Sequence, residues 1–259
     1  MATRRDNQKM TPSPKISIII PVLHLTRPLN KKRFFMPRQT IVDVLADIKK
    51  NVKANHEVIV VCNGTDEELR QFVRTSPDIT RYCLNSDNVG VARAWNMGAQ
   101  LADGDILCYL NDDVAVGPDA MESLAAQLVS DPLIGQIGPA GSYWRDCKHD
   151  RFVETDGPAE ADVVSGFCFL LRTETFHRLG GFDVGYTPAG CEEIDLSYRV
   201  RQAGLKCIVD PRSAFKHFHH HGVSAFNTDI HYMGNVVDTA TLHERNSAYF
   251  RKKWEHVFS

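Results

Sequence analysis

The first half of this chain alternates short apolar runs with stretches of helical periodicity. The runs are strand-like because they are short, rich in β-branched residues and bounded by turn residues; they span Ile16–Val22, Glu57–Cys62, Tyr82–Leu84 and Asp105–Leu110. Between the first two runs, Ile41, Leu45 and Ile48 recur at helical spacing. This alternation predicts an α/β fold with a mainly parallel, Rossmann-like central sheet and helices on both faces.

Three of the strands end in polar or turn residues, which are Val22-Leu23-His24, Cys62-Asn63-Gly64 and Asn111-Asp112-Asp113. In such sheets ligands bind beyond the carboxyl ends of the strands, so we expect these segments to meet in one cleft. Adjacent carboxylates need a compensating cation or strong donors, and oxygen-rich sites suit Mg²⁺ or Mn²⁺. Taken alone, Asn111-Asp112-Asp113 is more typical of an acidic loop or a helix N-cap.

The second half of the chain has a different pattern. Helices are expected over 119–129, 174–179, 192–203 and 242–258, and strand-like runs over 207–209 and 163–171, the latter broken by Gly166. In the last helix Tyr249, Phe250 and Trp254 are expected in the core. The polar residues 1–14 are expected to be disordered, and residues 15–259 to form a single domain.

Composition narrows the function classes. The chain has 259 residues, of which 43% are hydrophobic and 24% charged, enough for one large core. A formal net charge of −2 gives no reason to expect a nucleic-acid partner. Seven scattered cysteines without a Cys-x-x-Cys pair favour a reducing compartment. With neither an apolar leader nor a membrane-length apolar stretch in the sequence, we expect a cytoplasmic protein, with peripheral contact at the inner face of the membrane left open.

Several segments, in this order, resemble the family 2 glycosyltransferases of GT-A fold, including rhamnosyltransferase-like members. They are Ile16–Pro21, Val58–Thr65, Asn88–Gly98, Asn111–Asp113, Ser165–Phe167, Gly180–Asp183, and Glu192–Leu196 with Arg199. Each motif is loose, whereas their order and spacing over about residues 15–255 are specific.

The resemblance implies an inverting transfer from a nucleoside-diphosphate sugar donor to a glycan or lipid-linked saccharide acceptor, in surface polysaccharide synthesis. Mn²⁺ or Mg²⁺ would be the cofactor, bound to the donor diphosphate. Residues 15–115 would form the nucleotide-sugar-binding half of the domain, and residues 116–259 the acceptor and catalytic half.

Direct displacement needs a base for the acceptor hydroxyl and charge stabilisation for the leaving diphosphate. The resemblance assigns the metal to Asp113 and the base to Glu193. The second catalytic candidate is Asp195, which would position the acceptor or pair with Arg199 at the i,i+4 spacing. From the residues alone, Glu192-Glu193 is more typical of helix-start acids favoured by the helix dipole. The resemblance also implies a donor-binding set, which is Pro21, Asn63, Asn88, Gly90, Arg93, Asn96 and Asp112.

Four histidines lie within five positions, at His217 and at 219–221. Family members often place a metal-ligating histidine in a similar context. His219 fits that spacing best, and His217 is its close rival because it directly follows a strand-and-turn unit. Adventitious metal binding by the histidine run is a further interpretation.

The chain departs from the family pattern at two positions. Cys62 stands where the family has an aspartate that contacts the nucleobase, and Asn111 replaces the first aspartate of the metal motif. The basic segment 24–38 is longer than expected. It is interpreted either as a surface insertion or as a functional loop, which would be a lid or a contact for an anionic acceptor such as a lipid-linked diphosphate. Two further segments, 143–145 and 186–188, are acceptor-loop candidates that are equally typical of surface turns.

Two other function classes compete with the transferase. One is a non-catalytic glycan-binding or nucleotide-binding relative, which the changes at Cys62 and Asn111 would permit. The other is a sugar nucleotidyltransferase, which needs a glycine-rich loop after the first strand to hold a triphosphate. Residues 21–29 contain no glycine, so this class ranks below the others.

Overall fold

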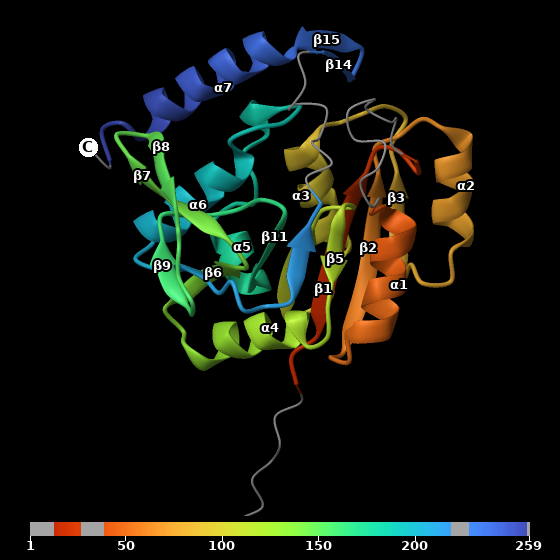
Figure 1. Ribbon diagram of the computed structural model, residues 1–259. Helices are drawn as coiled ribbons and strands as arrows, with labels where there is room; N and C mark the ends of the chain where they lie inside the picture. The colour runs from red at the N-terminus through yellow and green to blue at the C-terminus, as the bar shows by residue number, and fades with distance from the viewer. Residues whose placement is uncertain (1–12, 27–38, 219–227, 258–259) are drawn as a thin grey trace, which may run out of the picture.

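The computed structural model describes residues 13–26, 39–218 and 228–257. Its centre is an eight-stranded sheet (Figure 1). In spatial order the strands are β3 (Arg81–Leu84), β2 (His56–Cys62), β1 (Ile16–Val22), β4 (Ile106–Leu110), β11 (Cys168–Arg172), β6 (Ile134–Gly138), β12 (Lys206–Val209) and β9 (Ala159–Ala161). The pairs β1–β2, β1–β4, β2–β3 and β6–β12 are parallel, whereas β11 and β9 run antiparallel to their neighbours. The predicted α/β class with a mainly parallel sheet is therefore confirmed.

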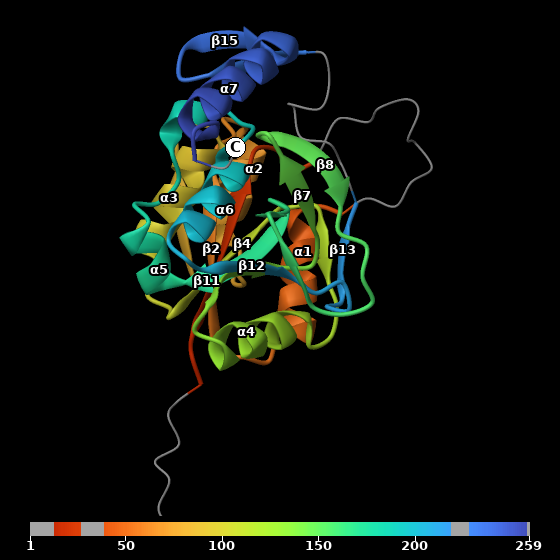
Figure 2. The same cartoon turned by 90° about the vertical axis from the view of Figure 1, so that its left-hand side faces the viewer.

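Helices cover both faces of the sheet. One face packs against α1 (Ile41–Asn51), α2 (Glu67–Thr75) and α4 (Ala120–Ser130), and the other against α3 (Val91–Leu101), α5 (Thr173–Arg178) and α6 (Glu192–Gln202). Figure 2 shows α3 and α5 on one side and α1 on the other. Successive side chains of a strand point to opposite faces, so Ile18 and Ile20 belong to the first core and Ile19 to the second.

Three smaller sheets stand beside the central one. They pair β5 (Val114–Val116) with β13 (Phe215–His217), join β10 (Val163–Val164), β7 (Gly141–Arg145) and β8 (Lys148–Phe152), and pair β14 (Asp229–Tyr232) with β15 (Asn235–Asp238). Sequence periodicity did not predict β5 to β9 or the last hairpin, because these strands are short and several are exposed. The run predicted over 163–171 is split at Gly166 into β10 and β11, as expected.

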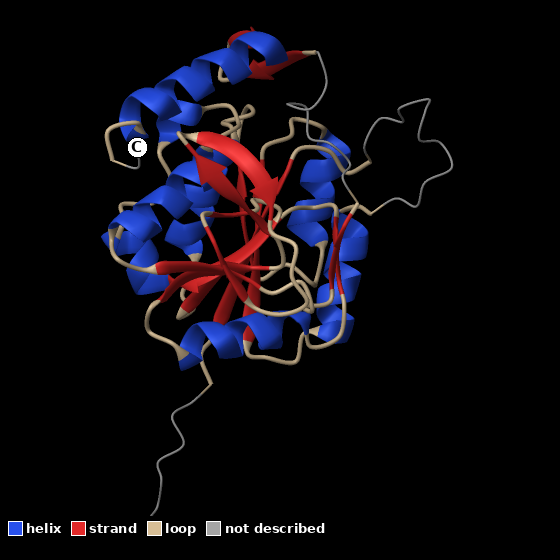
Figure 3. Ribbon diagram, turned by 60° about the vertical axis from the view of Figure 1, so that its left-hand side comes forward, coloured by secondary structure: helices blue, strands red, loops and turns tan. Residues whose placement is uncertain are grey.

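The final helix, α7 (Thr239–Trp254), lies across the end of the molecule toward which β1 points (Figures 1 and 3). Phe250 and Trp254 are buried, but Tyr249 is 40% exposed, so its predicted place in the core was wrong. The hairpin β14–β15 docks on the loop before α3, where the Asn88 side chain donates to the His231 carbonyl at 3.1 Å. The Met233 amide donates in return to the Asn88 carbonyl at 3.1 Å. Both C-terminal elements thus lie at the carboxyl edge of the parallel strands.

Candidate active site

The pairing of β5 with β13 brings Asp113 and His217 together. His217 is the register partner of Val114, the residue after Asp113, and the Phe218 amide donates to the Asp113 carbonyl at 3.0 Å. The Nε2 atom of His217 lies 3.3 Å from Oδ1 of Asp113. Both side chains are largely withdrawn from solvent, with 18% of His217 and 3% of Asp113 exposed. An imidazole and a carboxylate from two distant parts of the chain thus form one polar site.

Phe167 connects this site to the start of α6. Its ring stacks on the His217 imidazole with centroids 4.5 Å apart and an interplanar angle of 14°, and its carbonyl accepts from the Asn111 amide at 2.9 Å. The preceding residue, Gly166, lies directly against Glu193: a Cβ atom on Gly166 would sit 2.9 Å from Cγ and 3.2 Å from Cδ of Glu193. The missing side chain of Gly166 therefore makes room for the predicted base.

Helix α6 starts from a strained residue. Cys191 precedes it with φ = 75°, a backbone conformation uncommon for a residue with a side chain. Glu192 is buried, at 4% exposure, and Glu193 is half-buried. Burial raises the pKa of Glu193 above its ordinary value of 4.5. Burial and the nearby charge of Glu193 raise the pKa of Glu192 well above the same value. Both carboxyl groups are therefore tuned toward holding a proton.

Asp195 is fully buried and its carboxylate is saturated with donors. Arg199 Nε donates to Oδ2 at 2.8 Å, which is the predicted i,i+4 pair. Oδ1 accepts from Tyr186 Oη at 3.2 Å and from Trp254 Nε1 at 2.9 Å, and Lys253 Nζ lies 2.7 Å away. This geometry attaches α7 to α6 and leaves Asp195 badly placed to take a proton from an acceptor.

The donor side begins where β2, β3 and α3 meet. The Asn63 side chain donates to the Gly90 carbonyl at 3.3 Å and accepts from Asn85 Nδ2 at 2.9 Å. Gly90 has φ = 82°, and a Cβ there would lie 2.7 Å from the Pro188 carbonyl oxygen. Asn88 accepts from the Gly90 amide at 3.0 Å, which closes the turn before α3. These contacts bring the predicted residues Asn63, Asn88 and Gly90 together.

The other candidate donor-binding residues differ in their side-chain contacts. The buried Nε atom of Arg93 has no hydrogen-bond partner within the described residues, so this guanidinium keeps capacity for an anion. Both polar atoms of the Asn96 side chain instead engage the Phe182 backbone, at 2.8 and 2.9 Å, and so hold that loop. Asp112 is buried beside Asp113, and Pro21 is half-buried on β1.

The family model of glycosyl transferase family 2 matches residues 30–180, which is more than half of the chain. The chain belongs to glycosyl transferase family 2. The predicted family is thereby confirmed.

Curated relatives of this glycosyl transferase family 2 chain come from both bacteria and animals. Validoxylamine A glucosyltransferase of Streptomyces hygroscopicus subsp. limoneus is 24% identical over 249 residues, which cover 80% of this chain and 54% of the relative. Polypeptide N-acetylgalactosaminyltransferase 8 of Drosophila melanogaster is 26% identical over 194 residues, covering 64% and 33%. O-antigen biosynthesis protein RfbC of Myxococcus xanthus is 25% identical over 237 residues, covering 79% and 17%. The chain thus spans about half, or less, of the length of these relatives.

Two solved structures show the same fold. GalNAc-T7 in complex with UDP, GalNAc and Mn²⁺ superposes with a TM-score of 0.65 at 19% identity, covering 79% of this chain and 44% of that one. Mannosyltransferase PcManGT from Pyrobaculum calidifontis, in complex with GDP-Man and Mn²⁺, gives a TM-score of 0.59 at 19% identity, covering 83% and 60%. The GT-A fold predicted from the sequence is confirmed.

For a family 2 chain, the donor set at Asp113 fits a divalent cation. Neighbouring ligands of an octahedral ion with bonds of about 2.1 Å stand about 3 Å apart, close to the 3.3 Å between Asp113 Oδ1 and His217 Nε2. Within the described residues no group of three or more His, Cys, Asp and Glu side chains is placed to hold a metal. Mg²⁺ and Mn²⁺ sites that hold a diphosphate commonly combine one or two protein carboxylates with substrate phosphates and water. A mixed oxygen and nitrogen pair suits Mn²⁺ better than Mg²⁺.

Some of the predicted site residues fall outside the described residues. One residue of the site was not predicted. His219 and the basic positions 27–38 fall outside the described residues. Cys62 is buried at the end of β2, and its thiol lies 3.4 Å from the Gly64 carbonyl. Beside it, the side-chain amides of Asn63 and Asn85 are hydrogen-bonded to each other. Asn85 was missed, although it follows the third predicted strand as Asn63 follows the second. Within the described residues, none of the helices combines the length and apolar character that a membrane crossing demands.

Proposed function

We propose that this family 2 glycosyltransferase is an inverting, metal-dependent enzyme that transfers a sugar from a nucleoside-diphosphate donor to a glycan or lipid-linked acceptor. The observation that carries the proposal is the contact series from Glu193 through Gly166 and Phe167 to His217 and Asp113. Through this series, the loop of Gly166 and Phe167 contacts Glu193, whose pKa is raised, and also contacts His217, which forms the proposed cation-binding pair with Asp113. A base and a diphosphate site are the two functions that a direct displacement requires.

In the proposed reaction Glu193 accepts the proton of the acceptor hydroxyl as that oxygen bonds to the anomeric carbon of the donor sugar. The bond from the anomeric carbon to the diphosphate breaks in the same step, and its electron pair leaves with the nucleoside diphosphate. Attack opposite the leaving group inverts the anomeric configuration. A divalent cation held by Asp113 and His217 would supply charge neutralisation for the diphosphate. We assign Arg93 to the same anion, and Asn63, Asn88 and Gly90 to the nucleoside side.

We place the reaction in the synthesis of a surface polysaccharide, on the cytoplasmic side of the membrane, with peripheral membrane contact where the acceptor is lipid-linked. The relative involved in O-antigen biosynthesis supports the first point. The seven cysteines, all free thiols in the structure, support the second.

The deciding experiment compares Glu193→Gln with the wild-type chain. Hydrolysis of nucleoside-diphosphate sugars and transfer to saccharide acceptors are measured with Mn²⁺, and binding of UDP, GDP and TDP is measured separately. We expect turnover to fall by about 10²–10⁴-fold, the usual contribution of a general base, while nucleotide affinity stays near that of the wild type. Anomeric inversion is read by NMR of the product.

The same assay separates the competing classes. A non-catalytic relative would bind nucleotides but turn over no donor even as wild type, and a nucleotidyltransferase would release pyrophosphate from a nucleoside triphosphate. A Glu193→Gln enzyme of normal turnover would contradict the assignment of the base.

A further inference from the structure

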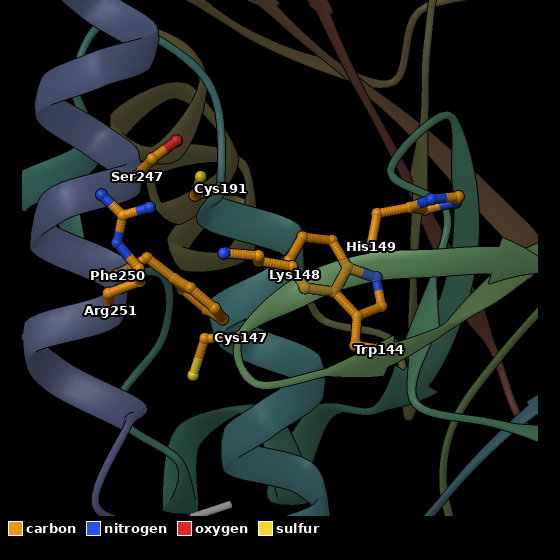
Figure 4. Close-up of a pocket in the computed structure, with 8 residues that line it drawn as sticks. All are labelled: Trp144, Cys147, Lys148, His149, Cys191, Ser247, Phe250 and Arg251. Carbon is orange, nitrogen blue, oxygen red and sulfur yellow. The ribbon is translucent and has the colours of Figure 1, made fainter. Parts of the chain in front are cut away.

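A pocket of about 220 Å³ opens beside the start of α6, between the β7–β8 hairpin and α7 (Figure 4). Trp144 and Lys148 line it from the hairpin, Ser247 and Arg251 from α7, and Cys191 from the turn before α6. Its volume is below the about 300–1,000 Å³ of pockets for drug-sized ligands. It therefore has room for one small unit of a larger molecule.

The pocket adjoins the proposed base. Cys191, which contributes to the wall, stands two residues before Glu193, and burial together with the nearby charge of Glu193 raises the pKa of the Cys191 thiol to about 12. From Glu193, contacts run through Gly166 and Phe167 to the proposed cation-binding pair of Asp113 and His217. The pocket wall and the proposed base are thus carried by the same turn at the start of α6.

Two positively charged side chains, Lys148 and Arg251, line the pocket. Neither Lys148 nor Arg251 forms an ion pair or a side-chain hydrogen bond within the described residues, and both are exposed. Figure 4 shows Lys148 extending from the hairpin toward α7, where Ser247 and Arg251 lie. Asp146 and Glu255 act electrostatically on the thiol of the nearby Cys147, but neither lines the pocket. An ammonium and a guanidinium on facing elements suit a carboxylate or a phosphate.

The aromatic wall is fixed before any ligand binds. Trp144 Nε1 donates to Ser142 Oγ at 2.9 Å, and the Trp144 amide donates to Asp162 Oδ2 at 2.7 Å. The indole also makes edge contacts with Phe250 and Tyr198, at centroid distances of 5.8 and 6.4 Å. A rigid, half-exposed indole offers an apolar surface for one face of a sugar ring at low entropic cost.

We propose that this pocket is the acceptor subsite and that it selects a saccharide unit bearing an acidic group, with the ring against Trp144 and the anion between Lys148 and Arg251. This rests on the proposed transferase function and narrows its acceptor class to anionic saccharides.

The test is a ligand-observed NMR titration with four probes: methyl β-glucoside, methyl β-glucuronide, glucose 6-phosphate and inorganic phosphate. We expect the two acidic sugars to bind about tenfold more tightly than the neutral glycoside, the scale of an exposed charge-assisted contact. Phosphate alone should bind more weakly than glucose 6-phosphate, because it lacks the ring. The glucuronide and the phosphate ester distinguish a carboxylate from a phosphate as the preferred anion.

The double variant Lys148→Gln/Arg251→Gln should lose the preference for acidic probes, and Lys252→Gln, an exposed cation on the same helix but outside the pocket, should keep it. Equal affinity for neutral and acidic sugars, or a preference that survives in the double variant, would overturn the proposal. Donor hydrolysis by the wild-type chain is measured in parallel. Failure of hydrolysis counts against the transferase function, whereas loss of probe selectivity with intact hydrolysis counts against the pocket alone.

Discussion

His217 is held in place by its neighbours on two sides, because its ring stacks on Phe167 and its Nε2 faces Asp113. Its strand, β13, is fixed by pairing with β5. An imidazole restrained in this way can bind a cation without first losing rotamer freedom. Of the two histidines that the sequence left as rivals, His217 is therefore the one for which a structural reason can be given.

We expect His217→Ala to raise the Mn²⁺ concentration needed for half-maximal turnover by about 10–100-fold, the cost commonly seen when metal-site residues are lost. At saturating Mn²⁺ part of the activity should return, because Asp113 and the donor diphosphate are still present. Manganese titrations of donor hydrolysis measure the effect. His177→Ala, an exposed histidine on α5, is the matched control; an unchanged manganese requirement in His217→Ala would leave His219 as the candidate.

The raised pKa of Glu193 has a consequence for the pH profile. A base works only when deprotonated, so turnover should fall as the pH drops through its pKa, and burial places that fall above the ordinary value of 4.5. The pKa of Glu192 is raised further by burial and by the charge of Glu193, so Glu192 holds its proton while Glu193 titrates, and the equally neutral side chain of Glu192→Gln should leave this acid limb in place. Turnover at saturating donor, measured from pH 4 to 9, gives the limb directly. A limb that moves to lower pH in Glu192→Gln would show instead that Glu192 is charged when Glu193 titrates.

At the scale of elements, the short loop between β10 and β11 determines how α6 faces the cation-binding pair. Gly166→Ala would bring a methyl group to 2.9 Å from Glu193 Cγ, closer than real contacts allow, and so push the carboxylate aside. A displacement of about 1 Å at a catalytic group costs about 10²-fold in rate. We expect turnover to fall on that scale while nucleotide affinity is retained. Gly157→Ala, where a Cβ would meet nothing within 4 Å, should leave turnover unchanged; a normal Gly166→Ala enzyme would argue against Glu193 as the base.

The strands and helices that position the candidate site differ in how well they could be predicted from the sequence. Strands β1, β2 and β4 and helices α1 and α4 follow from periodicity, because each buries a whole stripe or run of apolar residues. The pair β5–β13 has only three residues a strand, too few for a period to appear. That pairing brings His217 to Asp113, so this contact could not be predicted from periodicity, and His219 lies outside the described residues. Asp195 matched a motif, but its buried partners come from residues 186 and 253–254, which no local pattern connects.

At the scale of the whole molecule, two of the points that fasten α7 to the rest bear on α6. Asn246 donates to the carbonyls of Tyr186, Ala189 and Gly190, and Trp254 with Lys253 reaches Asp195. Both points lie on the segment that leads into or belongs to α6. The last helix therefore supports the position of the proposed base.

We expect Asp195→Ala to lower the free energy of unfolding by about 3–5 kcal/mol, the cost of leaving buried partners of an ion pair uncompensated. Urea unfolding measures the loss, and Asp150→Asn, which breaks the surface pair with Arg151, should cost about 0.5 kcal/mol or less. Asp195→Asn keeps the volume and should be milder. A folded, fully stable Asp195→Asn protein without turnover would instead make Asp195 a catalytic group.

One helix thus carries two separate tasks on adjacent stripes. Asn246, Phe250 and Trp254, spaced four residues apart, are at most 3% exposed and serve attachment. Ser247 and Arg251, one position later at the same spacing, line the pocket. Neighbouring positions on a helix point in directions about 100° apart, so the second stripe can change without loosening the first. Because we propose this pocket as the acceptor subsite, we expect related enzymes to differ in acceptor choice through this pair of side chains on α7, and randomising the codons of Ser247 and Arg251 would be a route to a new acceptor.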